Sequence, residues 1–255
     1  MLIDTHCHLD FSDFDADREA VVTRALAAEV DHIVIPSVTV DNLQRVIDLC
    51  ASSPCFHPAL GLHPCFPHDT DAALNTLAQA LEVNKVVAIG EIGLDFRPGQ
   101  IEAEVQQPLF EQQLQLARQY DLPVLLHVVR AHDQVLKLLR RYQLPRAGIV
   151  HAFSGSEQQA REYAKLGFKL GIGGAISYER AQKLRRLAAE LPLEWLVLET
   201  DAPDMPLESH RGKPNEPARV AGVAALIAAL RGLSIEEVAR KTSVTAQQLL
   251  RLPAY

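Results

Sequence analysis

The sequence predicts an α/β protein that forms a single (β/α)8 (TIM) barrel, and three observations support this prediction. The chain has 255 residues, 48% hydrophobic and 22% charged, and about 250 residues is the usual length of such a barrel. An apolar segment followed by an amphipathic segment recurs along the whole chain. Residues that commonly bind metals stand at the ends of the apolar segments, where a barrel carries its active site.

The apolar segments are predicted as parallel strands, because nearly continuous hydrophobic runs suit a sheet that is covered on both faces. They lie near 2–6, 32–36, 56–62, 86–90, 123–127, 147–151, 168–172 and 195–199. Helical periodicity predicts helices near 15–28, 41–51, 70–81, 103–119, 132–141, 156–165, 178–189 and 217–230. An open doubly wound sheet is the alternative, but it normally has a glycine-rich loop after its first strand. Here His6-Cys7-His8 stands at that position, which favours the barrel.

We expect one domain over residues 1–255, with the barrel over about 1–230 and extra C-terminal helices over about 233–252. Two short helical patterns occupy this tail, Ser234 to Arg240 and Thr245 to Arg251. Two helices joined by a turn can form a DNA-reading helix-turn-helix. Few cations lie nearby, so we favour helices that pack on the barrel.

Composition also limits the location and the partners of the protein. No apolar run reaches membrane-spanning length and the first twenty residues are rich in Asp, so we expect a cytoplasmic protein that contacts no membrane. We assume a monomer. The formal net charge of −7 argues against a broad basic DNA-binding surface. A phosphate-bearing substrate would then be held locally, by metal ions and a few cationic side chains.

The first predicted strand ends in a candidate metal-binding motif. Strand side chains alternate between two faces, so Asp4, His6 and His8 share one face and Cys7 points to the other. A bare His-x-His motif is more often a pair of exposed histidines than a metal site. Further candidate ligands at the later strand ends favour the metal site over a pair of exposed histidines.

Four further ligand candidates stand at later strand ends. Glu91 follows the fourth strand, His127 and His151 end the fifth and sixth, and Asp201 follows the eighth. A barrel would bring them to the same end as His6 and His8. Imidazoles and carboxylates suit Zn, Mn, Fe or Co. Because six ligands exceed what one catalytic ion needs, we expect two divalent ions that share a hydroxide.

The ligands divide into two groups in this hypothesis. One ion takes His6, His8 and Asp201, and the other takes His127 and His151. Glu91 bridges the two ions, because its strand lies across the barrel between the groups. Asp201 is also the candidate to hold the hydroxide and accept its proton, which makes Glu91 and Asp201 the predicted catalytic residues.

In combination, the motifs resemble the TatD family of metal-dependent deoxyribonucleases, within the amidohydrolase-type barrels, and especially its YjjV-type members. The matching segments are Asp4-Thr-His-Cys-His-Leu-Asp10, Gly61-Leu-His-Pro64, Gly90-Glu-Ile-Gly-Leu-Asp-Phe96, His151-Ala-Phe-Ser-Gly155, Glu199-Thr-Asp-Ala-Pro203 and Gly212-Lys-Pro-Asn-Glu-Pro217. The resemblance implies a two-metal hydrolase that depends on Mg in many members, and we expect two divalent ions, Mg, Mn or Zn. It also implies nuclease activity, often 3′ to 5′ on single-stranded DNA, and supports the six ligands.

Substrate contacts are predicted at four residues. By resemblance, His63 would contact a substrate phosphate, and Arg130 would replace an arginine that the family often has one position earlier. Lys213 and Asn215, in the loop after the last strand, are the other two candidates. Asp95 is expected to orient a ligand rather than to bind metal.

Three functions remain open from the sequence. The first is a phosphodiester hydrolase, a 3′–5′ exonuclease on single-stranded DNA. The second is an ester or amide hydrolase, such as a D-aminoacyl-tRNA deacylase, because the same water can attack a carbonyl carbon. The third is a non-enzymatic barrel for DNA binding or assembly. A lost ligand would indicate the third function, and none of the six is lost.

Overall fold

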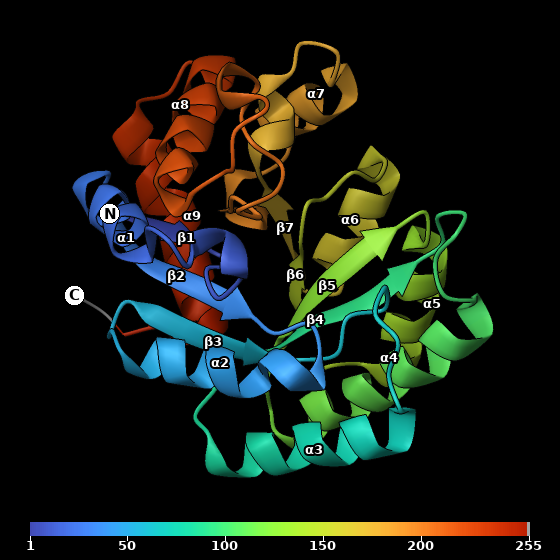
Figure 1. The fold of residues 1–255 in the computed structure, drawn as a ribbon. Coiled ribbons are helices and arrows are strands. Elements are labelled where there is room, and N and C mark those ends of the chain that lie inside the picture. The colour runs from blue at the N-terminus through green and yellow to red at the C-terminus, as the bar shows by residue number, and fades with distance from the viewer. Residues whose placement is uncertain (254–255) are drawn as a thin grey trace. The chain divides into compact units, whose positions relative to one another are not determined.

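The structure is a computed structural model and describes residues 1–253. Its strands follow one another in the sheet in chain order (Figure 1): β1 Leu2–Asp4, β2 Val30–Pro36, β3 Phe56–Leu60, β4 Ala88–Asp95, β5 Val124–Val129, β6 Gly148–Val150, β7 Lys169–Ile172 and β8 Leu196–Leu198. Every pairing whose register is defined is parallel. This succession confirms the predicted (β/α)8 fold class.

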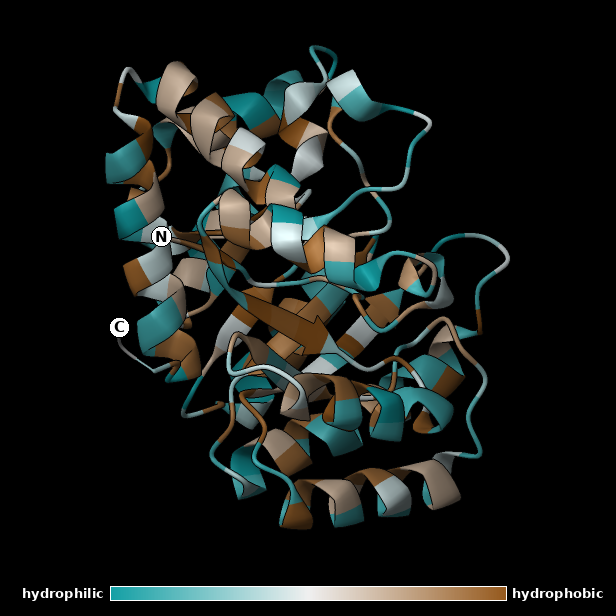
Figure 2. Cartoon of the chain, turned by 60° about the vertical axis from the view of Figure 1, so that its left-hand side comes forward, coloured by the Kyte–Doolittle hydropathy of each residue, from teal (hydrophilic) through white to brown (hydrophobic). Residues whose placement is uncertain are grey.

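Helices separate the strands at the predicted places. They are α1 Arg18–Ala27, α2 Val40–Ala51, α3 Thr70–Val83, α4 Ala103–Gln119, α5 His132–Tyr142, α6 Glu157–Lys165, α7 Gln182–Glu190, α8 Val220–Arg231 and α9 Ile235–Leu250. Short 3-10 turns are η1 Ser12–Phe14, η2 Gly174–Ser177, η3 Leu193–Trp195, η4 Glu208–His210 and η5 Pro217–Arg219. In Figure 2 the strands are mainly hydrophobic and the helices alternate between hydrophobic and hydrophilic residues, as the patterns predict.

The chain divides into two compact units, Met1–Ile35 with Leu170–Tyr255 (unit 1) and Pro36–Lys169 (unit 2). In unit 1, β1 pairs with β2, and β7 pairs with β8. The amide of Thr5 donates to the carbonyl of Leu198 at 3.0 Å, so the chain after β1 also lies beside β8. The first and last strands of the chain are therefore neighbours.

The C-terminal tail differs from the sequence prediction. It forms one continuous helix, α9, instead of two short ones. The helix begins at the predicted cap, where the amide of Glu237 donates to Ser234 Oγ at 3.1 Å. Thr242 and Ser243, in the predicted break, are buried, and no glycine or proline interrupts the helix there. Helix α9 packs against β1, β8 and α8, so this segment contains no helix-turn-helix.

No single helix within residues 1–253 is long and apolar enough to cross a membrane; only the bent pair Pro217–Arg231 and Ile235–Leu250, which meet at 115°, passes such a test when taken together.

In unit 2, strands β3 to β6 form consecutive parallel pairs (Figure 1). Helices α2, α4 and α5 pack against β3, β4 and β5, and α3 packs against α2 and α4. Fully buried aliphatic residues such as Ile89 of β4 and Leu125 of β5 belong to the hydrophobic core of this unit. Strand β4 is longer than predicted and runs to Asp95, with an irregularity in its pairing between Ile89 and Ile92. Glu91 therefore lies within β4, at this irregularity, and not after the strand.

Two buried glutamines of α4 hold the ends of two strands. The side chain of Gln113 accepts from the amide of Leu62 at 2.8 Å and donates to its carbonyl at 3.0 Å. The side chain of Gln106, about two helical turns earlier, makes the same pair of bonds with the backbone of Asp95, both at 2.7 Å. Buried backbone groups need partners, and here a helix side chain supplies them where strand pairing stops. The helical periodicity did not reveal this role.

We expect Gln113→Ala to lower the free energy of unfolding by about 2–4 kcal/mol, because it leaves a buried N–H and a buried C=O of Leu62 without partners. Urea denaturation monitored by circular dichroism measures the change. Gln112→Ala is the matched control, since Gln112 is exposed on the same helix. Equal stability of the two variants would contradict the bracing role.

Candidate metal centre

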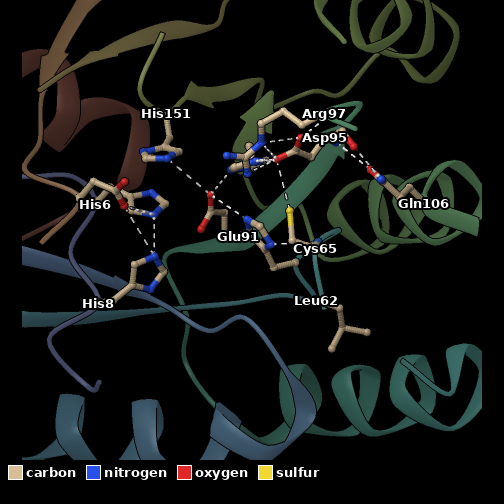
Figure 3. Close-up of polar contacts among 12 residues, drawn as sticks. His6, His8, Leu62, Cys65, Glu91, Asp95, Arg97, Gln106 and His151 are labelled. Carbon is tan, nitrogen blue, oxygen red and sulfur yellow. Dashed lines mark hydrogen bonds and ion pairs between the residues drawn. The ribbon is translucent and has the colours of Figure 1, made fainter. Parts of the chain in front are cut away.

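Unit 1 brings together His6, His8 and Asp201. The two imidazoles follow β1, and their Nε2 atoms lie 3.3 Å apart (Figure 3). Oδ1 of Asp201 lies 3.8 Å from each of these nitrogens. The amide of Asp201 donates to the carbonyl of His6 at 2.8 Å, which ties the loop after β8 to the chain after β1. This is the group that the sequence analysis assigns to one ion.

The spacing of these three atoms fits a metal ion. Bonds of about 2.0–2.2 Å to nitrogen and oxygen place neighbouring ligand atoms about 3–3.6 Å apart around a cation. The observed distances of 3.3 and 3.8 Å are close to this range. His6 and His8 are buried, whereas the side chain of Asp201 is 16% exposed. Three protein donors can therefore hold a cation and leave coordination positions on the exposed side.

Asp4 holds this group in place from within. Its Oδ1 accepts from the amides of His6 at 3.2 Å and Thr200 at 2.9 Å, and its Oδ2 accepts from Thr200 Oγ1 at 2.5 Å. Burial raises the pKa of Asp4 to about 8, even though the hydrogen bonds from Thr200 and His6 lower it. Asp4 thus connects the backbone of His6 to Thr200, the residue before Asp201. The strand alternation predicts only that Asp4 shares a face with the histidines.

Asn215 has a similar position behind Asp201. It is 2% exposed, and its Nδ2 donates to the carbonyls of Thr200 at 2.9 Å, Asp204 at 3.0 Å and Met205 at 3.3 Å. These bonds favour bracing of the loop after β8 over the predicted substrate contact. Lys213, in the same loop, is exposed, and its substrate contact stays a prediction.

Unit 2 gathers three imidazoles around one carboxylate oxygen. Oε1 of Glu91 lies 3.0 Å from Nδ1 of His127, 3.5 Å from Nε2 of His63 and 3.6 Å from Nε2 of His151. Glu91 is 2% exposed. The predicted ligands His127 and His151 are thus close to Glu91, and His63 joins them. The sequence predicts a substrate contact for His63, and its position at a strand end is also typical of a ligand.

Asp95 fixes the ring of His127. Its Oδ2 lies 2.9 Å from Nε2 of His127 and 2.5 Å from Nη2 of Arg97 (Figure 3). Burial alone would raise the pKa of Asp95, but hydrogen bonds from His127 and Arg97 bring it well below its usual value. This contact is the one expected of a residue that orients a ligand. Arg97 was missed in the sequence analysis.

The environment of His127 also fits a metal. A neutral ring that donates Nε2–H to Asp95 presents the lone pair of Nδ1 to Oε1 of Glu91, and two lone pairs at 3.0 Å need a proton or a cation between them. Burial alone would lower the pKa of His127, but hydrogen bonds to Asp95, Cys65 and Glu91 raise it well above its usual value. The carboxylates of Glu91 and Asp95 thus favour a positive charge beside the His127 ring. Glu91, His127 and His151 can provide the ligand atoms for a cation there.

Arg130 follows β5 directly and is exposed, so its predicted phosphate contact stays a prediction. The bridging of two ions by Glu91 also stays a prediction. Unit 1 thus contains the donors His6, His8 and Asp201. In unit 2, His63, His127 and His151 surround Glu91.

Comparison with known proteins gives a consistent result. The model of the family described as TatD related DNase matches residues 3–251. The chain is 46% identical to the uncharacterized metal-dependent hydrolase YjjV of Escherichia coli K12, over 98% of each chain. It is 35% identical to the 3′–5′ ssDNA/RNA exonuclease TatD of Erwinia billingiae, over 99% of this chain and all of the relative. The crystal structure of E. coli YjjV superposes with a TM-score of 0.95, covering 99% of this chain and 98% of the other.

A parallel eight-stranded α/β fold with clustered imidazole and carboxylate donors is typical of metal-dependent barrel enzymes, and the family match puts this chain among the hydrolases of that class. Within that class, the chain belongs to the TatD family.

We expect Asp4→Asn to weaken divalent metal binding at the His6–His8–Asp201 group by about 10–100-fold, because the amide cannot accept all the donors that now fix these ligands. Isothermal titration with Mn²⁺ measures the affinity. Asp13→Asn is the control, since Asp13 is exposed in η1. Unchanged Mn²⁺ affinity in a folded Asp4→Asn protein would contradict the bracing role.

Proposed function

We propose that this protein hydrolyses phosphodiester bonds of nucleic acid, as a 3′–5′ exonuclease on single-stranded DNA, with two divalent cations. The observation that carries this proposal is the gathering of imidazoles around a carboxylate within each unit, at 3.8 Å from Asp201 in unit 1 and at 3.0–3.6 Å from Glu91 in unit 2. In the proposal the cations are held by His6, His8, Glu91, His127, His151 and Asp201.

Divalent cations, when bound, supply Lewis acidity that neutralises phosphate charge and makes water acidic enough to act as a nucleophile near neutral pH. The chain's own residues provide the remaining steps. Asp201 is the proton acceptor, because its side chain is 16% exposed and can meet water, whereas Asp4 is fully buried. Asp95, held by Arg97 and His127, keeps the His127 ring in one orientation.

The choice of nucleic acid as substrate has two supports. Relatives of about one-third identity are named 3′–5′ ssDNA/RNA exonucleases. The net charge of −7 is unsuited to a surface that holds duplex DNA by its backbone, but a single-strand end in a cleft needs only local cations. Arg130 and Lys213 are the exposed cations that we propose for this contact, and His63 contacts the scissile phosphate.

We expect Glu91→Ala to lower kcat/KM on a 3′-labelled single-stranded oligonucleotide by at least about 100-fold and to remove bound metal, because it deletes a carboxylate donor among three imidazoles. Elemental analysis of the purified protein gives the metal content. Loss of two ions supports the bridging role, and loss of one ion would overturn that role while leaving the ligand assignment in place. Full turnover would overturn both. Glu104→Ala, at an exposed position of α4, is the control.

An aminoacyl ester and an aminoacyl-tRNA tested beside the oligonucleotide separate attack at phosphorus from attack at carbon. Faster cleavage of the ester by the wild-type protein, lost in Glu91→Ala, would replace nuclease by ester or amide hydrolase. Binding of DNA without cleavage of any of these substrates, in metal-loaded protein, would contradict an enzymatic function.

A further inference from the structure

Cys65 is a donor that the proposed hydrolysis does not use. It follows His63 and Pro64 in the loop after β3 and is partly exposed. Its amide donates to Nδ1 of His63 at 3.1 Å, and its Sγ lies 3.3 Å from Oδ2 of Asp95 (Figure 3). The backbone bond to His63 holds the loop so that the thiol faces the imidazoles of unit 2.

Cys65, His63 and His127 form a compact set of donors. One ligand atom from each of the three lies within 4.8 Å of the others. Asp95 adds an oxygen, because its Oδ2 is 2.9 Å from Nε2 of His127 and 3.3 Å from the sulfur. One sulfur, two imidazole nitrogens and a nearby carboxylate make up the donor type of zinc sites, whereas Mg²⁺ prefers oxygen ligands.

We propose that His63, Cys65 and His127 form a binding site for a thiophilic divalent cation of the zinc type. On binding, the Sγ–H bond of Cys65 breaks and its proton leaves to solvent. The proton on Nε2 of His127 moves by way of solvent to Nδ1, where Oε1 of Glu91 accepts it. The electron pairs of the sulfur, of the freed Nε2 and of a ring nitrogen of His63 then form the bonds to the cation. No oxidation or reduction takes place. The Arg97 guanidinium offsets the charge of Asp95, so the thiolate and the two imidazoles provide the main attraction.

This site makes the protein discriminate between metals. His127 is shared, since its Nδ1 faces Glu91 and its Nε2 faces Asp95. A cation bound to Cys65 and His127 competes with the Asp95 contact that orients the ring. Zinc-type cations therefore engage unit 2 with a sulfur donor that Mg²⁺ does not use, and an excess of zinc is expected to slow hydrolysis supported by Mg²⁺.

Titration of the full-length, metal-stripped protein with Co²⁺ tests the site, with Cys65→Ser and Cys55→Ser compared with wild type. A sulfur ligand gives a thiolate-to-cobalt charge-transfer band in the near ultraviolet. We expect this band in wild type and in Cys55→Ser, and its loss in Cys65→Ser, with Zn²⁺ affinity lowered by at least about tenfold. Cys55 is the matched control because it is also partly exposed and lies in unit 2, outside the donor set.

The two proposals fail in different ways. A wild-type protein without the cobalt–sulfur band, or with the same band in Cys65→Ser, would overturn the Cys65 site whatever the nuclease assay shows. Mg²⁺ affinity equal in wild type and Cys65→Ser, together with the lost band, would support a site selective for thiophilic ions. Circular dichroism of Cys65→Ser establishes that the variant is folded, and Cys65→Ala provides a second sulfur-free variant.

Discussion

Hydrogen bonds between buried polar side chains and the backbone at strand ends are the constraint on which the site depends. At these ends the parallel pairing stops, and the free N–H and C=O groups of the backbone need other partners. Gln106 and Gln113 provide them for the segments that carry Asp95 and His63. Asp4 and Asn215 do so around Thr200, next to Asp201. The ligands stand on backbone that is held from behind and do not rely on flexible loops for their position.

This bracing has a cost that explains the electrostatics of the site. Carboxylates such as Asp4 and Glu91 are almost completely removed from water. In the buried interior the charged form of a carboxylate is unfavourable unless donors or cations are close. In unit 1 burial raises the pKa of Asp4 to about 8, because the neutral donors around it lower the pKa by less than burial raises it. In unit 2, Arg97 and the imidazoles compensate Asp95 and Glu91. Bound divalent cations fit naturally into such surroundings.

Unit 2 contains more donors than one ion requires. Glu91 has three imidazoles within 3.6 Å, and Cys65 adds sulfur on the side of Asp95. His127 connects the two sets of donors through its two ring nitrogens. The choice of metal in this unit is thus a question of which donors an ion prefers, since oxygen, nitrogen and sulfur are all present. In the proposed site, the His127 ring links the donors around Glu91 to those around Cys65, and the ion that binds depends on which of these donors it prefers.

The sequence by itself determined the fold class and the order of strands and helices, because hydrophobic periodicity is a local property of the chain. It also predicted the six proposed ligands, from residue type at strand ends. It also identified the cap at Ser234, but it divided α9 in two, since burial of Thr242 and Ser243 against the rest of unit 1 is not visible in a local pattern. Only the tertiary structure decided that Gln106, Gln113 and Asn215 brace backbone, that His63 faces Glu91, and that Arg97 and Cys65 both reach Asp95. These roles depend on contacts between residues that are distant in sequence. The local sequence around a residue does not predict which distant residue it contacts after folding.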